Sequence, residues 1–213
     1  MGRPRRQDTR RTQIVEAAVK AIVARGYERV RIKDIAAEAG VSSQTVLYYF
    51  PDVEALLLET LSRLIHRFVE MRRDTADAVG DPVSQLAATI WAGLPAGPDD
   101  EIAVIYVSLG SIRRNPALRA LSRALTEQQV ELYRRILEAG SARGAFELRE
   151  SSLVIAENLV ALEDAYGLYI IEGDPITPEH AISRIATYAA AAVGVVHEDL
   201  LPASGGSRPA DAL

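Results

Sequence analysis

The 213-residue chain contains no cysteine, which excludes disulfide bonds and thiolate metal sites. Its three histidines, His66, His180 and His197, lie far apart without the spacing of metal ligands, so no metal site is expected. No apolar run reaches the roughly 18 residues that cross a bilayer. The basic N-terminus has no apolar stretch behind it, unlike a secretory signal. We therefore expect a soluble, cytoplasmic protein.

Sequence features of enzymes are also missing. There is no glycine-rich phosphate-binding loop, and VSLGS lacks the glycine–serine–glycine arrangement of a nucleophile elbow. Glu163 and Asp164 are adjacent, so on a helix their side chains point in different directions and do not form an acid/base pair. We expect neither an enzyme nor a cofactor.

Charge is distributed unevenly along the chain. The first 50 residues contain ten lysines and arginines and five acidic residues, a net charge of +5. Because the whole chain has a net charge of −5, the remaining residues carry −10. A basic N-terminal part on an acidic body indicates a polyanionic partner. A solvated charged surface would explain the charge pattern equally well.

Hydrophobic periodicity predicts helices almost throughout and no clear strand, so the expected fold class is all-α. Glycine and proline residues mark the ends of most helices. The closing sequence LPASGGSRPADAL is small, polar and rich in proline and glycine, which predicts disorder. The expected helices span residues 8–25, 32–39, 42–50, 53–74, 83–93, 101–113, 117–142, 151–172 and 179–197.

Three short helices, with a tight turn at Gly40 between the second and third, indicate a helix-turn-helix. On a helical wheel the third helix places Val46, Tyr49 and Phe50 on one side. The opposite side is uncharged and polar or aromatic, which suits reading base edges in a DNA major groove. The alternative is that its hydroxyls cap the helix and its tyrosines are half-buried core. The residues of the opposite side are Ser43, Gln44, Leu47 and Tyr48.

The first 60 or so residues resemble the TetR family of bacterial transcriptional regulators. The matching run is RTQIVEAAVKAIVARGYERVRIKDIAAEAGVSSQTVLYYFPDVEALL. The segments SLGSIRRNPALRALSRALTEQQ and YGLYIIEGDPITPEHA are more loosely similar to a branch that includes choline/betaine-responsive repressors. The resemblance implies a DNA-binding domain over residues 1–52, a helical effector-binding and dimerisation domain over residues 53–198, and a tail over residues 199–213.

The resemblance implies roles for individual residues of the helix-turn-helix. Ser43, Gln44 and Tyr48 are expected to contact base edges or the groove wall, and Leu47 a thymine methyl group. Phosphate-contacting or positioning residues are expected among Arg31, Lys33, Thr45 and Tyr49.

The sequence differs from the family pattern at some positions, and two of the residues named above could have a structural role instead. Val53 stands where the family usually has a phosphate-contacting lysine. Thr45 and Tyr49 could equally be structural. The arginines at positions 3, 5 and 6 could contact the minor groove or phosphates, or form a free basic arm.

Two C-terminal segments have the composition of a dimer interface. Residues 153–171 are apolar nearly all round, which requires burial on both sides. The sequence HAISRIATYAAAAVGVV has alanines where close helix packing is useful. Two such helices from each subunit would form a two-fold four-helix interface and present two recognition helices to a palindromic operator. The alternative is that both faces are buried within one subunit.

An unknown small-molecule effector is implied by the family, and large aromatic or acidic residues of the middle helices are candidates for binding it. Aromatic rings together with carboxylates could hold a cation. Alternatively, Glu163 pairs with an arginine such as Arg113 or Arg114 and the aromatics are core. A second reading of the whole protein is a DNA-binding interaction protein whose body docks a protein partner. The candidate effector residues are Trp91, Tyr106, Tyr133, Glu163 and Asp164.

Overall fold

A computed structural model describes residues 3–108 and 115–201, with side chains from residue 7 onward. Every regular element in these ranges is helical, as the sequence predicts for an all-α fold. The expected tail over residues 199–213 lies outside the described residues from position 202. The elements are α1 Arg3–Arg25, α2 Ile32–Glu38, α3 Ser43–Tyr49, α4 Val53–Asp77, α5 Pro82–Ala92, α6 Glu101–Ser108, α7 Pro116–Ala142, α8 Ser152–Glu172, α9 Pro178–Val193 and the 3-10 helix η2 His197–Leu200.

Two helix ends differ from the sequence prediction. Helix α1 begins at Arg3, so the arginine-rich segment continues the helix instead of forming a free arm. Arginine is a good helix former, and a helix already nucleated extends at little cost. Helix α9 ends at Val193 because Gly194 adopts a left-handed conformation with φ of 74°. Residues 109–113 of the helix expected over 101–113 lie outside the described residues.

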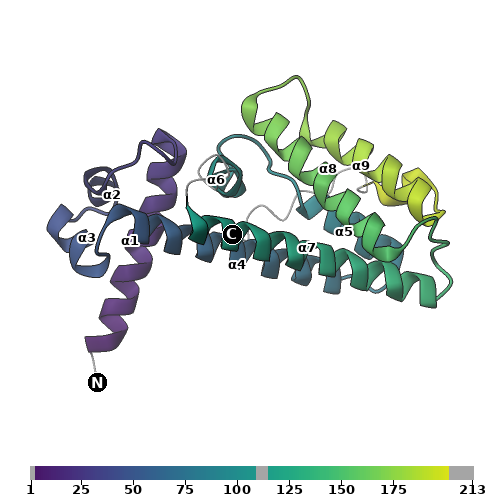
Figure 1. Cartoon of the computed structure of the whole chain (residues 1–213), viewed down its shortest axis with the longest axis horizontal. Coiled ribbons are helices and arrows are strands. Elements are labelled where there is room, and N and C mark those ends of the chain that lie inside the picture. The colour runs from purple at the N-terminus through teal and green to yellow at the C-terminus, as the bar shows by residue number, and fades with distance from the viewer. Residues whose placement is uncertain (1–2, 109–114, 202–213) are drawn as a thin grey trace.

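The helices form a head and a longer body (Figure 1). The head consists of α1, α2 and α3, and α4 runs from it along α7 through the body. Helix α8 packs on α7 and α9, while α6 contacts α1, α4 and α8. None of the helices in the described ranges is both long enough and apolar enough to cross a membrane.

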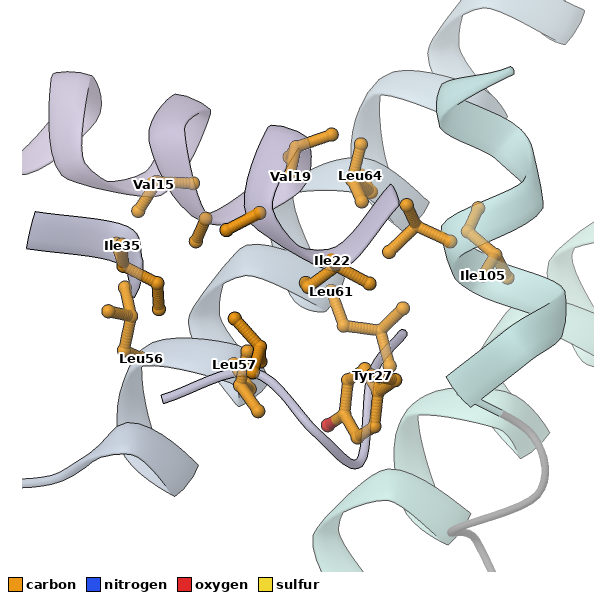
Figure 2. Close-up of a cluster of buried hydrophobic side chains, with 14 of the residues drawn as sticks. Val15, Val19, Ile22, Tyr27, Ile35, Leu56, Leu57, Leu61, Leu64 and Ile105 are labelled. Atoms are coloured by element: carbon orange, nitrogen blue, oxygen red, sulfur yellow. The ribbon is translucent and has the colours of Figure 1, made fainter. Parts of the chain in front are cut away.

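One apolar cluster joins the head to the body (Figure 2). Ile22 of α1 and Tyr27 after it pack with Leu61 and Leu64 of α4, and Ile105 of α6 belongs to the same cluster. Burial of such side chains is the main contribution to stability. The position of the head is therefore set by α4 and α6 together.

A second cluster fills the rest of the body between α5, α7, α8 and α9. At its edge Gly167 of α8 faces the ring of Tyr106 of α6, both of them buried. A Cβ atom on Gly167 would lie 2.6 Å from the Tyr106 hydroxyl oxygen. The absence of a side chain at position 167 therefore allows α6 to approach α8.

We predict that Gly167→Ala lowers the free energy of unfolding by about 1–3 kcal/mol, because it overpacks the contact between α8 and Tyr106. Urea unfolding followed by circular dichroism measures the change. Gly80→Ala is the matched control, since a Cβ atom there meets nothing within 4 Å. Equal stability of the two variants would contradict the close packing of α6 on α8.

Candidate nucleic-acid interface and effector site

Helix α3 has one buried and one exposed face. Val46 and the following Phe50 are almost fully buried against the head core. Leu47 is 47% exposed and Tyr48 is 73% exposed. Ser43 and Gln44 lie on the exposed side with them. The helix thus presents an uncharged surface to solvent that can offer an amide, hydroxyls and an apolar group to a base-pair edge.

Thr45 and Tyr49 have structural contacts within the head. The Ser42 hydroxyl accepts a hydrogen bond from the Thr45 backbone N–H at 3.1 Å and lies 2.9 Å from the Thr45 hydroxyl, so Thr45 is part of the N-cap. Tyr49 is half-buried against the apolar cluster of the head. Its ring lies edge-on to the ring of Tyr48, with centroids 5.1 Å apart.

The two cationic candidates lie at the start of α2. The Arg31 guanidinium donates hydrogen bonds to the backbone carbonyls of Glu28 at 3.0 Å and Val30 at 3.1 Å. The Arg31 backbone N–H donates to the Asp34 carboxylate at 3.0 Å, which helps to cap the helix. Lys33 is exposed. Arg31 is therefore folded against its own loop, while Lys33 extends from the head surface.

The body contains a polar cluster that is almost fully buried. The Arg72 guanidinium of α4 donates to the Glu163 carboxylate of α8 at 2.7 Å and to the Tyr133 hydroxyl of α7 at 3.1 Å. It also donates to the Gln129 side-chain oxygen and, at 3.0 Å, to the Thr89 carbonyl of α5. The Tyr133 hydroxyl donates to Glu163. These five residues, the Arg72 cluster below, connect α4, α5, α7 and α8.

Burial and charge act against each other in the Arg72 cluster. Burial raises the pKa of Glu163 to about 7, opposed by the Arg72 guanidinium and the Tyr133 hydrogen bond. Burial alone would lower the pKa of Arg72, but the charge of Glu163 raises it above its ordinary value, so Arg72 stays cationic. One Glu163 oxygen and the Arg72 Nε are buried without a hydrogen-bond partner. The cluster is therefore closely packed, although two of its polar atoms lack a hydrogen-bond partner.

The structure confirms the sequence alternative that Glu163 pairs with an arginine. That arginine is Arg72, 91 positions away in the chain, and Arg113 and Arg114 had been suggested only as examples. Arg113 and Arg114 themselves lie outside the described residues. In the sequence Arg72 belongs to the charged run RRD, which is typical of a solvated face. Its helical register with the buried Phe68 and Ala76 was the signal that could have identified it.

A cavity of about 50 Å³ lies beside the Arg72 cluster. Its walls include Phe68 of α4, Ile105 and Tyr106 of α6, Gln129 of α7 and Asp164 of α8. Gln129 belongs to both the cavity wall and the Arg72 cluster, and the Arg72 guanidinium carbon lies 5.5 Å from the Phe68 ring centroid. The cavity thus combines aromatic surfaces with polar groups next to a buried ion pair.

Asp164 places a carboxylate in the wall of this cavity. Burial raises its pKa to about 6, and the nearby positive charge of Arg72 opposes the rise. Among the described residues, none donates a hydrogen bond to Asp164 or forms an ion pair with it. A half-buried carboxylate without a partner is costly unless a cation or water reaches it. It is therefore a candidate contact for a positively charged ligand.

The five residues suggested as effector contacts fall into three groups. Tyr106 and Asp164 line the cavity. Tyr133 and Glu163 are buried in the Arg72 cluster beside it. Trp91 is half-buried in α5 against the second apolar cluster. Phe68 and Gln129 of the cavity wall were not singled out from the sequence, because a phenylalanine and a glutamine within long helices have ordinary structural roles.

The outer surface of α8 carries exposed apolar side chains. Leu153 is 46%, Val154 40% and Tyr169 44% exposed. On the same side of the body, the Asn158 amide donates to the Tyr188 hydroxyl of α9 at 2.8 Å. Within the described single chain, α8 is thus buried on its inner side only, and its outer side exposes apolar surface.

We predict that Arg72→Met lowers the free energy of unfolding by about 3–5 kcal/mol, because it leaves the Glu163 carboxylate buried without its cation. The double variant Arg72→Met/Glu163→Leu should lose clearly less, since both charges are then gone. Arg73→Met, in an exposed pair with Glu70, is the matched control and should change stability by less than about 1 kcal/mol. Urea unfolding measures all three, and a double variant at least as unstable as Arg72→Met alone would contradict this account.

Comparison with known proteins shows which proteins this chain is similar to. The model of the bacterial regulatory proteins of the tetR family matches residues 14–60. The HTH-type transcriptional regulator BetI of Agrobacterium fabrum is 34% identical over 173 residues, covering 76% of this chain and 75% of the relative. The HTH-type transcriptional repressor NicS of Pseudomonas putida is 30% identical over 151 residues, covering 68% of this chain and 69% of the relative.

Solved structures with a similar fold are also transcriptional regulators. A transcriptional regulator from Saccharomonospora viridis in complex with choline has a TM-score of 0.79 and 26% identity, covering 86% of this chain and 96% of that chain. A TetR transcription regulator from Haloarcula marismortui has a TM-score of 0.76 at 23% identity, a likeness of fold. The family match in the head, the BetI relative covered over three quarters of its length and the shared fold lead to one conclusion: the chain belongs to the bacterial TetR family and is a DNA-binding transcriptional regulator, not an enzyme.

Proposed function

We propose that the protein is a dimeric repressor that binds a palindromic operator and is released from it by a small-molecule effector. Residues 1–52 read the DNA, and residues 53–198 bind the effector and form the dimer. The observation that carries the proposal is the exposed, uncharged face of α3 on a basic head. The NicS relative, whose printed description is a repressor, supports the direction of regulation.

In this proposal the exposed face of α3 enters the major groove. The Gln44 amide has the geometry to pair with an adenine edge, and Leu47 can contact a thymine methyl group. Ser43 and Tyr48 contact neighbouring bases or the groove wall. Lys33, Arg31 and the partly buried Thr45 and Tyr49 contact phosphates or hold the helix in place.

The dimer is proposed to form through α8 and α9. Exposed apolar side chains on α8 support it, because such residues favour burial against a second copy. A two-fold axis between two α8–α9 pairs makes the same patch contact itself. Two heads then face half-sites about one turn of DNA apart, which requires a palindromic operator.

We predict that selection from random duplex DNA with the full-length protein enriches one palindromic site. Gln44→Ala and Tyr48→Ala should each bind that site about tenfold more weakly or worse, because each removes a base contact. Binding isotherms on the enriched duplex and on a scrambled duplex measure the effect. The control is Arg123→Ala, an exposed residue of α7 in the body. Salt-sensitive binding without an enriched site would refute a sequence-specific repressor.

We propose that the effector is a small organic cation bound in the cavity between α4, α6, α7 and α8. The Asp164 carboxylate supplies a counter-charge, and the rings of Phe68 and Tyr106 supply surfaces that attract cations. The structural neighbour from Saccharomonospora viridis was solved with choline, a ligand of this class. The cavity also favours a small-molecule effector over the alternative of a docked protein partner.

The size of the cavity suggests how the effector would act. A volume of about 50 Å³ holds only a few water molecules, so a larger ligand must move at least one wall. Ile105 of α6 lines the cavity and also belongs to the apolar cluster of the head. A ligand that displaces α6 therefore changes the packing of the head. Binding then favours a conformation with lower operator affinity.

We predict that choline binds, and that its affinity rises as the pH increases from 5 to 8. Asp164, with a pKa of about 6, is protonated at the lower pH and ionised at the higher one, and only the ionised form attracts a cation. Asp164→Asn should weaken binding about tenfold at pH 8. It should also reduce the pH dependence to the part that the neighbouring Glu163, with a pKa of about 7, contributes. Isothermal titration calorimetry measures both.

The control ligand is 3,3-dimethyl-1-butanol, which has the shape of choline without its charge. It should bind weakly to both proteins and without dependence on pH. Equal affinity of choline for the native protein and for Asp164→Asn would contradict the assigned role of the carboxylate. Binding of the neutral alcohol as tightly as choline would contradict a cationic effector.

A further inference from the structure

Arg11 of α1 connects the end of α3 to α4. Its Nε donates to the two Glu59 carboxylate oxygens at 2.9 and 3.1 Å, and its Nη2 also pairs with Glu59. Its Nη1 donates to the backbone carbonyl of Tyr49, the last residue of α3, at 3.1 Å. The guanidinium carbon lies 4.4 Å from the ring centroid of Phe50. One side chain thus touches α4, the last turn of α3 and the residue after it.

Helix α3 needs such contacts because it is short. It spans seven residues, carries no charged side chain and has one fully buried residue, Val46. The last carbonyls of a helix have no partner within the helix. The Phe50 backbone N–H donates to the Val46 carbonyl at 3.0 Å, and Arg11 donates to the Tyr49 carbonyl. The Ser42 cap fixes one end of α3, and Arg11 fixes the other.

The turn before Arg11 reaches the same end of α3. Gln7 lies four residues earlier and therefore on the same face of α1. Its amide lies 3.5 Å from the Tyr48 hydroxyl, a long hydrogen bond. The first turns of α1 therefore lie along the C-terminal end of the recognition helix. The hydrogen bond from Arg11 to the Tyr49 carbonyl is the shorter of these two contacts between α1 and this end of α3.

A basic residue in a DNA-binding head is usually interpreted as a phosphate contact, but the geometry of Arg11 argues against that role. Its three nitrogens are directed at Glu59 and the Tyr49 carbonyl. The Glu59 hydrogen bond and charge raise the pKa of Arg11, and the Arg11 hydrogen bond lowers the pKa of Glu59. Glu59 also pairs with Arg63, so its carboxylate offsets only part of the positive charge. The N–H groups of Arg11 are instead occupied by partners within the protein.

We propose that Arg11 is a positioning residue for sequence reading: it holds the last turn of α3 against Glu59 of α4 and so sets how α3 enters the groove. The inference rests on the proposed operator binding. Arg11 acts through α3 and touches no base itself. Its loss reduces discrimination between sequences without removing a phosphate contact.

The test compares Arg11→Met with the native full-length protein on the enriched operator duplex and on a scrambled duplex of equal length. Methionine can still pack on Phe50 but cannot donate hydrogen bonds. We expect the ratio of operator to scrambled affinity to fall about tenfold, the loss expected for one misplaced base contact. Affinity for the scrambled duplex and the slope of binding against salt concentration should equal those of Arg63→Met, which removes the same charge from the same group. A phosphate contact would instead reduce that slope by about one.

The matched control is Arg63→Met. Arg63 donates to the same Glu59 carboxylate at 2.5 Å and to the Thr12 hydroxyl at 3.1 Å. Within the described part of the chain it donates no hydrogen bond to α3. Its variant should keep the affinity ratio within about twofold of the native protein. Arg11→Lys preserves a positive charge beside Glu59 and protects the test against unfolding of the methionine variant. We expect it to keep the native melting temperature and lose part of the discrimination.

The outcomes separate this inference from the proposed function. If the native protein shows no preference for any duplex, the proposed operator binding fails and this inference fails with it. If the native protein discriminates and the folded Arg11 variants discriminate equally well, only the positioning role is overturned. An equal loss of affinity for both duplexes with a reduced salt slope would make Arg11 a phosphate contact and also overturn it.

Discussion

The arrangement of the body depends on the ion pair between Arg72 and Glu163. Removing two charges from water is costly, and the cost is offset only when the groups meet in good geometry. Here that geometry requires α4, α7 and α8 each to present a side chain at one point, and α5 a carbonyl. Gly93 follows α5 at this point, where a Cβ atom would collide with the Glu163 carboxylate. The cluster therefore ties the positions of four helices to one point in the body.

Helix α4 connects this cluster to the DNA-reading head. Asp52 caps the helix directly after α3, Glu59 holds Arg11, Phe68 lines the cavity and Arg72 forms the buried pair. From Glu59 to Arg72 the helix rises about 20 Å. One continuous helix thus carries Phe68 in the cavity wall and Glu59, which pairs with Arg11 beside α3. In the proposed mechanism, α4 is the element that links a change at the cavity wall to the head.

Local patterns were sufficient to predict much of this structure. Periodicity, glycines and capping residues identified the helices, and the helical wheel of α3 separated Val46 and Phe50 from the exposed Leu47 and Tyr48. The residues that local patterns missed are those whose role comes from distant partners. Arg72 is paired across 91 positions and Arg11 across 48. Helical register with Phe68 and Ala76 marks position 72 as buried, but no local pattern identifies the partner of either arginine. The N-terminal extension of α1 was missed for a related reason, because an arginine-rich run has no apolar stripe to mark it as helical.

The apolar cluster shared by the head and the body has a consequence for the exchange of domains between relatives. Ile22 and Tyr27 of the head pack with Leu61 of α4 and Ile105 of α6 in one continuous core (Figure 2). A chimera that takes only its first 52 residues from another regulator would therefore join two halves of different cores. Close-packed interiors tolerate such mismatches poorly. New DNA specificity is thus easier to obtain by changing the surface of α3 than by transplanting the head.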